Sequence, residues 1–366
     1  MGLAERLADI EKEMGRTQIN KATERHLGML KAQKAKILAQ LLEEANASNG
    51  GGPQFDVART GDARVALFGF PSVGKSSLLS KLTGTESEVG DYDFTTVTAI
   101  PAILKVNGVK IQLLDLPGIL QGACTGYGRG KQVLGVVRST DLIVFVIDAA
   151  KADMEIATLT NELHNFGIRV NEEPPNIDIQ PNVRGGVTID ATVPLTHLSP
   201  DLIQTLATAN RFRSGHIIIR EDATVDRLLD AFNRKTLVYI PAIYVYNKVD
   251  TLTIEEIDRL AHLPNSVVAS VLYNLNLDRI SQAIYKKLDI TRVYTKPPGG
   301  KPDFEEAVLL RKNTTVRDLC MHIHKDLVDN FAGAQVWGAS SKRPGLQAGL
   351  DHVLMDEDVV CIKTSK

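Results

Sequence analysis

A glycine-rich segment near residue 70 has the residue types that bind phosphate. Gly69 to Ser76 fits the pattern GxxxxGK[ST] and lies between an apolar run, ARVALFGF, that predicts a strand and a stretch, KSSLLSKL, that predicts a helix. The amides of such a loop point at phosphate oxygens, while Lys75 neutralises the β- and γ-phosphates and the Ser76 hydroxyl ligates Mg²⁺. The residues that we predict to bind the phosphates are Gly69, Pro71, Ser72, Val73, Gly74, Lys75, Ser76 and Ser77.

Two later segments supply groups for the same chemistry. Asp115 and Gly118 of DLPG follow another apolar run, where the carboxylate can reach the metal shell and the glycine amide can bond the γ-phosphate. In the polar stretch before them, Thr96 is our first choice, and Thr95 our second, for a hydroxyl that completes the Mg²⁺ coordination. The predicted metal ligands are Ser76, Thr96 and Asp115, and the predicted catalytic residues are Lys75, Thr96 and Gly118.

A third motif concerns the base of the nucleotide. Asn247, Lys248 and Asp250 form NKVD at the end of a predicted strand that begins near Leu237. An aspartate carboxylate there can accept hydrogen bonds from both N1 and N2 of guanine, and adenine offers no such pair of donors. The motif therefore predicts GTP and GDP as ligands and disfavours a use of ATP. Further along the chain, Ser270 and Val271 are predicted to give a backbone amide to the guanine carbonyl.

The elements that must position these motifs alternate between strand and helix. The runs ARVALFGF, KIQLLDLPG and LIVFVID read as buried strands separated by helices, which predicts a mostly parallel sheet with helices on both faces. Between Asp148 and Leu237 the chain is about 60 residues longer than one strand–helix repeat of about 30 residues requires. We therefore predict a GTPase-type α/β domain at 63–168 plus 237–290, interrupted by an α+β module at 169–236.

The two ends of the chain have other patterns. Residues 1–46 repeat apolar positions at helical spacing and predict a helical hairpin, and 47–62 form a polar, glycine-rich linker. Between Arg16 and Lys36 six basic residues stand against one acid, which indicates either a solvated helix face or a contact with RNA or a partner. Residues 291–366 predict a small mixed sheet with a helix from Val316 to about Asn330.

Composition excludes several classes of protein. A net charge of −2 argues against a general nucleic-acid coater. Three widely spaced cysteines, no apolar run long enough to span a membrane and no signal peptide favour a cytoplasmic protein. His322 and His324 are two residues apart on a predicted helix and make a poor metal pair, and Cys124 has no base nearby that would activate it.

Taken together, the motifs resemble a known family. GFPSVGKSS, DYDFTT, DLPGIL and NKVD resemble the Obg-related GTPases, and FGIRVNEEPPNI, RVYTKPPGGKPDF and the N-terminal RTQINKATERHLGMLKAQKAKI resemble its DRG (developmentally regulated GTP-binding protein) branch. The resemblance implies a helical hairpin, a GTPase domain with an inserted module similar to a ribosomal-protein domain, and a C-terminal TGS domain of β-grasp type. It also implies a regulatory partner protein and a contact with ribosomes or rRNA, through the basic N-terminal helices and the TGS domain. We expect no membrane or DNA partner.

How such a protein would hydrolyse GTP is left open by the sequence. Ras-type enzymes place a glutamine after DxxG to orient the attacking water, and Ile119 stands there instead. Backbone groups of residues 94–98, a monovalent cation or a partner must replace it, so we expect slow turnover. The resemblance favours potassium, although Ser72 stands where related GTPases often have Asn. The alternative is a ribosome- or RNA-binding scaffold in which the nucleotide is mainly structural.

Overall fold

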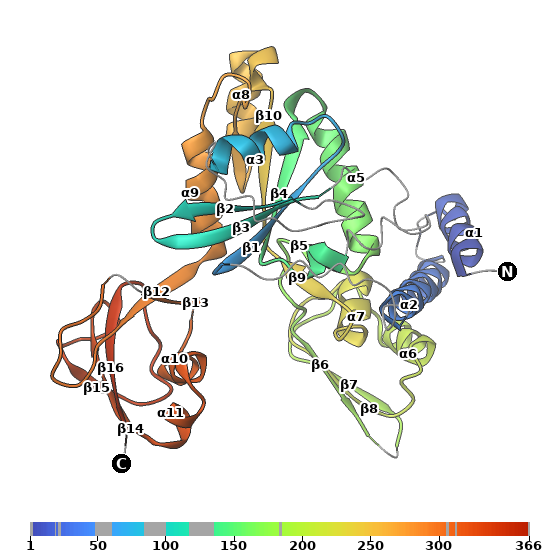
Figure 1. Ribbon diagram of the computed structural model, residues 1–366. Helices are drawn as coiled ribbons and strands as arrows, with labels where there is room; N and C mark the ends of the chain where they lie inside the picture. Colours follow the sequence, from blue (N-terminus) through green and yellow to red (C-terminus); the bar gives the residue numbers. More distant parts are fainter. Residues whose placement is uncertain are drawn as a thin grey trace.

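The computed structural model shows a central α/β domain with a helical hairpin on one side and a small C-terminal β domain on the other (Figure 1). Among the described residues, no helix combines the length and the apolar character needed to cross a bilayer. The structure describes residues 3–18, 20, 23–47, 61–83, 100–116, 135–182, 185–304, 307–311 and 313–364.

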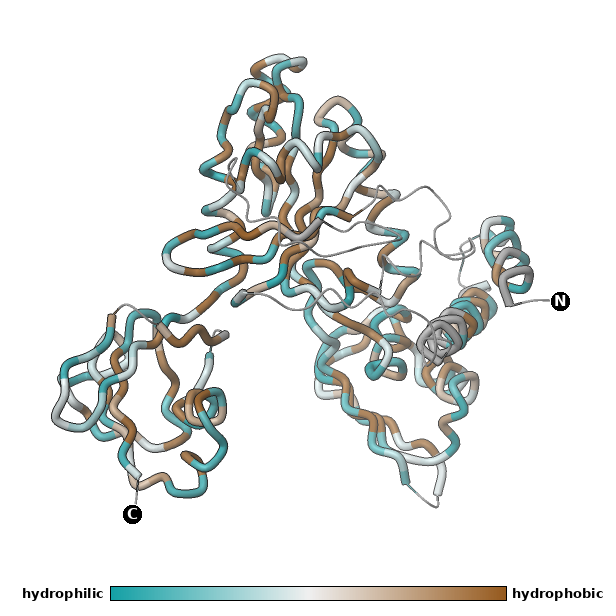
Figure 2. The backbone as a smooth tube through the Cα atoms, in the orientation of Figure 1, coloured by the Kyte–Doolittle hydropathy of each residue, from teal (hydrophilic) through white to brown (hydrophobic). Residues whose placement is uncertain are grey.

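The central sheet has six strands in the order β11-β10-β4-β1-β3-β2. Every pairing is parallel except that of β2 with β3. Hydrophobic residues follow these strands along most of their length (Figure 2), as expected for a sheet covered on both faces. The strands are β1 (Ala63–Phe68), β2 (Ile100–Val106), β3 (Val109–Asp115), β4 (Leu142–Asp148), β10 (Ala242–Asn247) and β11 (Ser266–Val268).

Helices cover the two faces of this sheet and form two separate cores. One core joins the sheet to α5 through Leu159 and Leu163 and to α8 through Leu260. The other joins it to α3 through Leu78 and to α9 through Ile280 and Ile284. These helices are α3 (Lys75–Thr83), α5 (Ala152–Asn165), α8 (Ile254–Ala261) and α9 (Leu277–Leu288).

Between β4 and β10 the chain forms a second, smaller unit. Its three-stranded sheet has the order β6-β8-β7, and helices α6 and α7 pack on it around Ile203, Leu206 and Leu228. The parallel pair β5-β9 stands where the chain leaves and re-enters the central domain. The elements are β5 (Ile168–Val170), β6 (Ile177–Pro181), β7 (Val187–Ala191), α6 (Pro200–Ala209), β8 (Gly215–Ile219), α7 (Val225–Phe232) and β9 (Val238–Ile240).

The prediction of a single strand beginning near Leu237 is wrong. This stretch divides at Pro241 into β9, which pairs with β5, and β10, which pairs with β4 and β11. Proline has no N–H to give to a ladder, so a central strand does not continue through it. The Pro241 carbonyl still accepts a bond of 3.0 Å from the Ile143 amide, which fixes the start of β10 beside β4.

The C-terminal unit is a five-stranded mixed sheet in the order β13-β12-β16-β14-β15, with α10 packed on one face. The single helix predicted from Val316 to Asn330 is wrong, because His324 adopts an extended conformation and ends α10. A capping box of Thr315 and Asp318 starts that helix. The elements are β12 (Ile290–Thr295), β13 (Ala307–Arg311), α10 (Val316–Ile323), α11 (Asp326–Asp329), β14 (Phe331–Trp337), β15 (Leu346–Ala348) and β16 (Asp358–Thr364).

At the other end, α1 (Leu3–Arg16) and α2 (Glu24–Ala47) form the predicted hairpin. The turn is closed at Asn20, whose side-chain oxygen accepts a 2.9 Å bond from the Thr23 amide. Helix α2 packs against the inserted unit, where Ala32 is buried in the core of α6 and α7. Gly28 allows this close approach, because a Cβ there would lie 3.0 Å from Leu202.

Candidate nucleotide-binding site

The predicted motifs meet at one edge of the central sheet. Asp115, Asp148 and Asn247 are the last residues of β3, β4 and β10, and the 69–76 loop follows β1. Since these four strands are parallel, their carboxyl ends lie together. This edge is where ligands bind in open α/β sheets.

The turn between β1 and α3 requires its two glycines. A Cβ on Gly69 would lie 2.2 Å from the Val146 carbonyl oxygen of β4. Gly74 has a φ of +99°, and a Cβ there would lie 2.5 Å from the Asn247 side-chain nitrogen. The turn therefore packs directly on β4 and β10, with Val73 buried and Pro71, Ser72 and Ser77 exposed.

Lys75 lies inside this turn. Its Nζ donates to the carbonyl oxygens of Phe70 at 2.8 Å and Gly69 at 3.2 Å. Burial lowers the pKa of Lys75, and the charges of Asp115 and Glu155 oppose that shift. The ammonium group is thus held at the loop by its own backbone.

Beside it, Ser76 and Asp115 are in direct contact. The Ser76 hydroxyl donates to the Asp115 carboxylate at 2.5 Å, joining the start of α3 to the end of β3. A hydroxyl and a carboxylate oxygen are hard donors of the kind that Mg²⁺ prefers, and such sites commonly use one or two carboxylates with nucleotide phosphates. The donor set therefore fits a magnesium ion.

At the other end of the site, Asn247 connects two loops. Its Nδ2 donates to the Val73 carbonyl at 2.8 Å, and its Oδ1 accepts from the Val271 amide at 3.0 Å. Asn247 is only 3% exposed, so both of its polar atoms depend on these partners. The side chain fixes the phosphate loop against the 270 loop.

Asp250 and Lys248 are held by side-chain contacts of their own. The Ser270 hydroxyl donates to Asp250 Oδ1 at 2.6 Å. Lys248 has a φ of +63°, a left-handed conformation, and its Nζ lies 2.8 Å from Asp148 Oδ2. These contacts bring together Asn247, Lys248, Asp250, Ser270 and Val271, the five residues predicted to contact the base.

Two carboxylates at this edge were missed by the sequence analysis. Asp148 binds Lys248, and its own amide donates to the Glu155 carboxylate of α5 at 3.1 Å. Burial raises the pKa of Glu155. The charge of Glu155 in turn acts to raise the pKa of Lys75. The position of Asp148 at the end of an apolar strand was a usable signal, whereas nothing marked Glu155.

Some predicted residues lie outside the part of the chain that the structure describes. They are Thr95, Thr96, Gly118, Ile119 and Cys124, together with residues 94, 97 and 98.

Comparisons with known proteins agree with this geometry. Residues 64–179 match the model described as "50S ribosome-binding GTPase", residues 184–290 match the C-terminal region of the same domain, and residues 291–364 match the TGS domain. The chain is 47% identical to Developmentally-regulated GTP-binding protein 2 of Mus musculus and 49% identical to Ribosome-interacting GTPase 1 of Saccharomyces cerevisiae. The mouse alignment covers 99% of each chain and the yeast alignment 98% of each. The chain belongs to the DRG family of GTPases.

This assignment confirms the predicted family and the fold class, a P-loop GTPase domain followed by a TGS domain. As a DRG-family GTPase, the chain binds guanine nucleotides. The division at 168/169 and 236/237 stays a prediction; the GTPase model ends at residue 179, and the model of its C-terminal region begins at residue 184. A likeness to the FeoB G domain of Methanococcus jannaschii, with a TM-score of 0.32 and 16% identity over 62% of this chain and 97% of that one, is too weak to add to the assignment.

Proposed function

We propose that this DRG-family protein is a switch that binds GTP, hydrolyses it slowly and changes its contacts with the translation machinery accordingly. The observation that carries the proposal is the link that Asn247 makes between the phosphate loop and the 270 loop, beside Asp250. In this proposal, Asp250 reads guanine, Lys248 covers the base, and the 270 loop, whose Val271 amide already donates to Asn247, lies beside the base carbonyl. Lys75 and the loop amides bind the phosphates.

Magnesium belongs to this proposal. Ser76 and Asp115 would hold it, with Thr96 as the third protein ligand, and the ion would neutralise charge on the β- and γ-phosphates. The chain's own contribution is to bring the two oxygen donors together at the end of β3, as their hydrogen bond does here. The Gly118 amide is proposed to contact the γ-phosphate.

Turnover and its dependence on potassium are tested together. Purified protein is assayed for GTP affinity and hydrolysis in KCl and in NaCl, with ATP as competitor. We expect GTP but not ATP to bind, and we expect potassium to raise the slow rate of GTP hydrolysis severalfold. Equal rates in both salts would remove the potassium part of the proposal, and effective competition by ATP would contradict the guanine site.

We also propose that the protein acts in the cytoplasm on ribosomes, together with a regulatory protein partner. The name of the yeast relative and the TGS domain support the ribosomal part. Co-sedimentation of the protein with ribosomes in the presence of GDP or a non-hydrolysable GTP analogue tests it. Equal sedimentation with both nucleotides would contradict a switch.

A scaffold for ribosomes or RNA, with incidental hydrolysis, is the second candidate. It is favoured by Ile119 in place of a water-orienting glutamine and by the basic N-terminal helices. Lys75→Ala and Asp250→Asn separate the two candidates. Ribosome binding that survives the loss of nucleotide would favour the scaffold, and binding lost with the nucleotide would favour the switch.

A further inference from the structure

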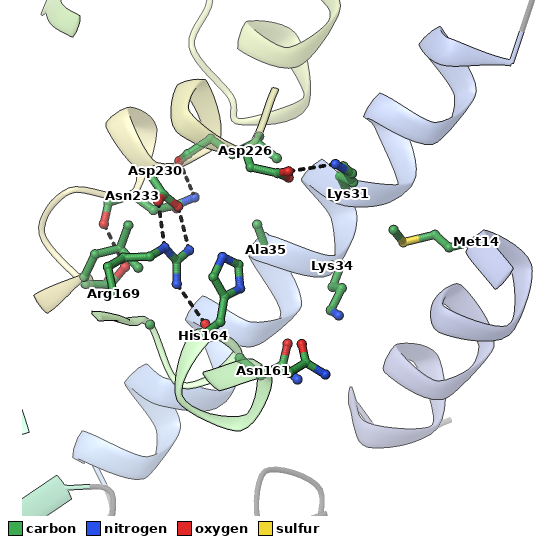
Figure 3. Close-up of a pocket in the computed structure, with 15 residues that line it drawn as sticks. Met14, Lys31, Lys34, Ala35, Asn161, His164, Arg169, Asp226, Asp230 and Asn233 are labelled. Carbon is green, nitrogen blue, oxygen red and sulfur yellow. Dashed lines mark hydrogen bonds and ion pairs between the residues drawn. The ribbon is translucent and has the colours of Figure 1, made fainter. Parts of the chain in front are cut away.

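The basic residues of the N-terminal hairpin fall into two structurally different groups. On one side of α2, Lys31 forms an ion pair of 2.8 Å with Asp226 of α7, and Lys34 forms one of 3.0 Å with Glu11 of α1. Figure 3 shows both lysines beside the cavity that separates α2 from α5 and α7. These two charges hold the hairpin in place and are already neutralised.

The opposite side of α2 carries a different set of side chains. They recur at intervals of three or four residues, so they form one stripe along the helix. At 1.5 Å per residue, the stripe is about 22 Å long. It consists of Arg25, Met29, Gln33, Lys36 and Gln40.

Two open hollows lie along this stripe. The first, of about 530 Å³, brings Lys36 together with Arg6 of α1 and with Arg211, which follows α6. The second, of about 690 Å³, places Arg25 and Met29 opposite the polar surface of α6. We call the stripe and both hollows the α2 groove. The α6 side chains that line it are Asp201, Gln204, Thr205, Thr208 and Ala209.

The charges of the α2 groove are not neutralised within the described part of the chain. Arg6, Arg25, Lys36 and Arg211 form no ion pair with any residue that the structure describes, while two acids, Asp9 and Asp201, line the hollows. The groove therefore has a net positive charge in a protein whose total charge is −2. A local cation surface on an otherwise balanced protein favours an anionic partner.

We propose that the α2 groove binds the sugar–phosphate backbone of RNA. The proposal rests on the proposed function in translation, and it adds which surface contacts the RNA and through which groups. Guanidinium groups pair with phosphate oxygens in a bidentate manner. The glutamine and threonine side chains of the groove can bond 2′-hydroxyls, which distinguish RNA from DNA.

An acidic protein fits the α2 groove less well than RNA does. Protein interfaces depend on buried aromatic or large apolar anchors. Among those side chains of the hairpin and the inserted unit whose burial the structure describes, the only large hydrophobic one with substantial exposure is Met29, at 39%. Ile10 and Ile37 also line the first hollow, but both are half-buried. A surface that presents mainly cations, amides and hydroxyls, without an exposed aromatic anchor, is typical of phosphate contacts that carry no base specificity.

Binding is tested by fluorescence anisotropy with a labelled polyuridine strand and an RNA duplex of the same length, over a range of KCl concentrations. The variant Lys36→Ala/Arg211→Ala removes two cations that come from different elements. We expect about tenfold weaker binding and a salt slope smaller by about 1.4 to 1.8, since each phosphate contact contributes about 0.7 to 0.9. Arg211→Lys keeps the charge and should retain most of the affinity.

The matched control is Lys105→Ala, which removes an exposed cation of β2 in the central sheet. Equal weakening by this control, or no weakening by the double variant, would overturn the proposal. So would preferential binding of polyglutamate, which would identify an acidic protein as the partner.

GDP affinity and ribosome co-sedimentation are measured on the same proteins. If the double variant loses binding to free RNA but still sediments with ribosomes, the α2 groove is supported as an RNA-binding surface and the proposed function stands. If the unmodified protein binds RNA but does not sediment with ribosomes, only the proposed function is refuted.

Discussion

The two ends of the nucleotide site differ in how their side chains are held. At the base end, Asn247 is bonded to two loops and Asp250 to Ser270, so these groups are fixed before any ligand binds. At the phosphate end, Lys75 donates to carbonyl oxygens of its own loop, and Ser76 donates to Asp115. Those bonds use the same atoms that phosphate and magnesium would use.

This difference predicts different energetic roles for the two ends. A preassembled base end gains affinity because little ordering remains to be done on binding. The phosphate end must exchange internal bonds for bonds to the ligand, so its net contribution depends on whether phosphate and metal are both present. We expect the base end to determine which nucleotide binds, and the phosphate end to distinguish its states.

The largest expected effect is at the phosphate end, with Lys75→Ala. Loss of a fixed cation at the phosphates should lower the rate of GTP hydrolysis by about 10² to 10³, as removal of one preorganised electrostatic group does in other enzymes. Single-turnover hydrolysis at saturating GTP measures it. The control is Lys81→Ala, an exposed lysine in the last turn of the same helix. A rate within a few fold of the unmodified protein would show that Lys75 has no role in the chemical step.

Next in size is Asp250→Asn at the base end. Replacing a carboxylate by an amide exchanges an acceptor for a donor, and hydrogen bonds to a charged group contribute about 1.5–3 kcal/mol. We expect GDP affinity to fall by about a hundredfold and xanthosine diphosphate, whose ring has a carbonyl at C2, to bind better than GDP.

Competition against a fluorescent nucleotide measures the change, with Asp278→Asn, an exposed acid at the start of α9, as the control. An unchanged preference for guanine would mean that another group reads the base.

The sequence predicted the motifs of both ends but not the bonds between them. GxxxxGK[ST] and NKVD are local patterns, and buried strands before them predict their places at the sheet edge. The contact of Asn247 with Val73 joins residues 174 positions apart, and no local pattern encodes it. The same is true of the α2 groove, where Arg6 and Arg211 meet only because α2 packs on the inserted unit.

The two incorrect elements have different causes. Pro241 stands inside an otherwise continuous apolar run, and its missing N–H could have predicted the division of that strand. The break at His324 has no proline or glycine beside it, so the tertiary structure and not local propensity ends that helix.

Asn247→Ala tests whether the hydrogen bonds that join the two ends of the site stabilise the folded protein. The substitution leaves the Val73 carbonyl and the Val271 amide without their partner, and each unsatisfied buried group costs about 1–3 kcal/mol. We expect the free energy of unfolding to fall by about 2–4 kcal/mol and GDP affinity to fall with it. Denaturant unfolding with and without GDP measures both.

A useful comparison is Asn276→Gly, because that asparagine also donates to a strand carbonyl, that of Val268, but is exposed. If the two variants lost equal stability, the buried bonds of Asn247 would contribute no more to folding than an exposed asparagine bond does.

The smallest expected effect concerns the Asp148–Lys248 pair behind the base end. Burial alone would raise the pKa of Asp148, but hydrogen bonds from Lys248 and the Ala150 amide, with the Lys248 charge, outweigh it and lower that pKa. A lowered pKa in the folded state stabilises the protein above the unfolded-state pKa, and that stability is lost as the pH falls. Because the Lys248 side chain is 42% exposed, we expect Asp148→Asn to cost only about 0.5–1 kcal/mol near neutral pH.

The pH dependence distinguishes this ion pair from a simple packing contact. The difference in unfolding free energy between the unmodified protein and Asp148→Asn should be constant from about pH 7 to 5 and shrink between about pH 5 and 3, where the carboxylate is protonated. Glu155, whose pKa burial raises, has the opposite pH dependence, but it is present in both proteins and largely cancels in the difference. A difference that stays constant down to pH 3 would show that Asp148 acts through its hydrogen bonds and not through its charge, and the base end would then be held by geometry alone.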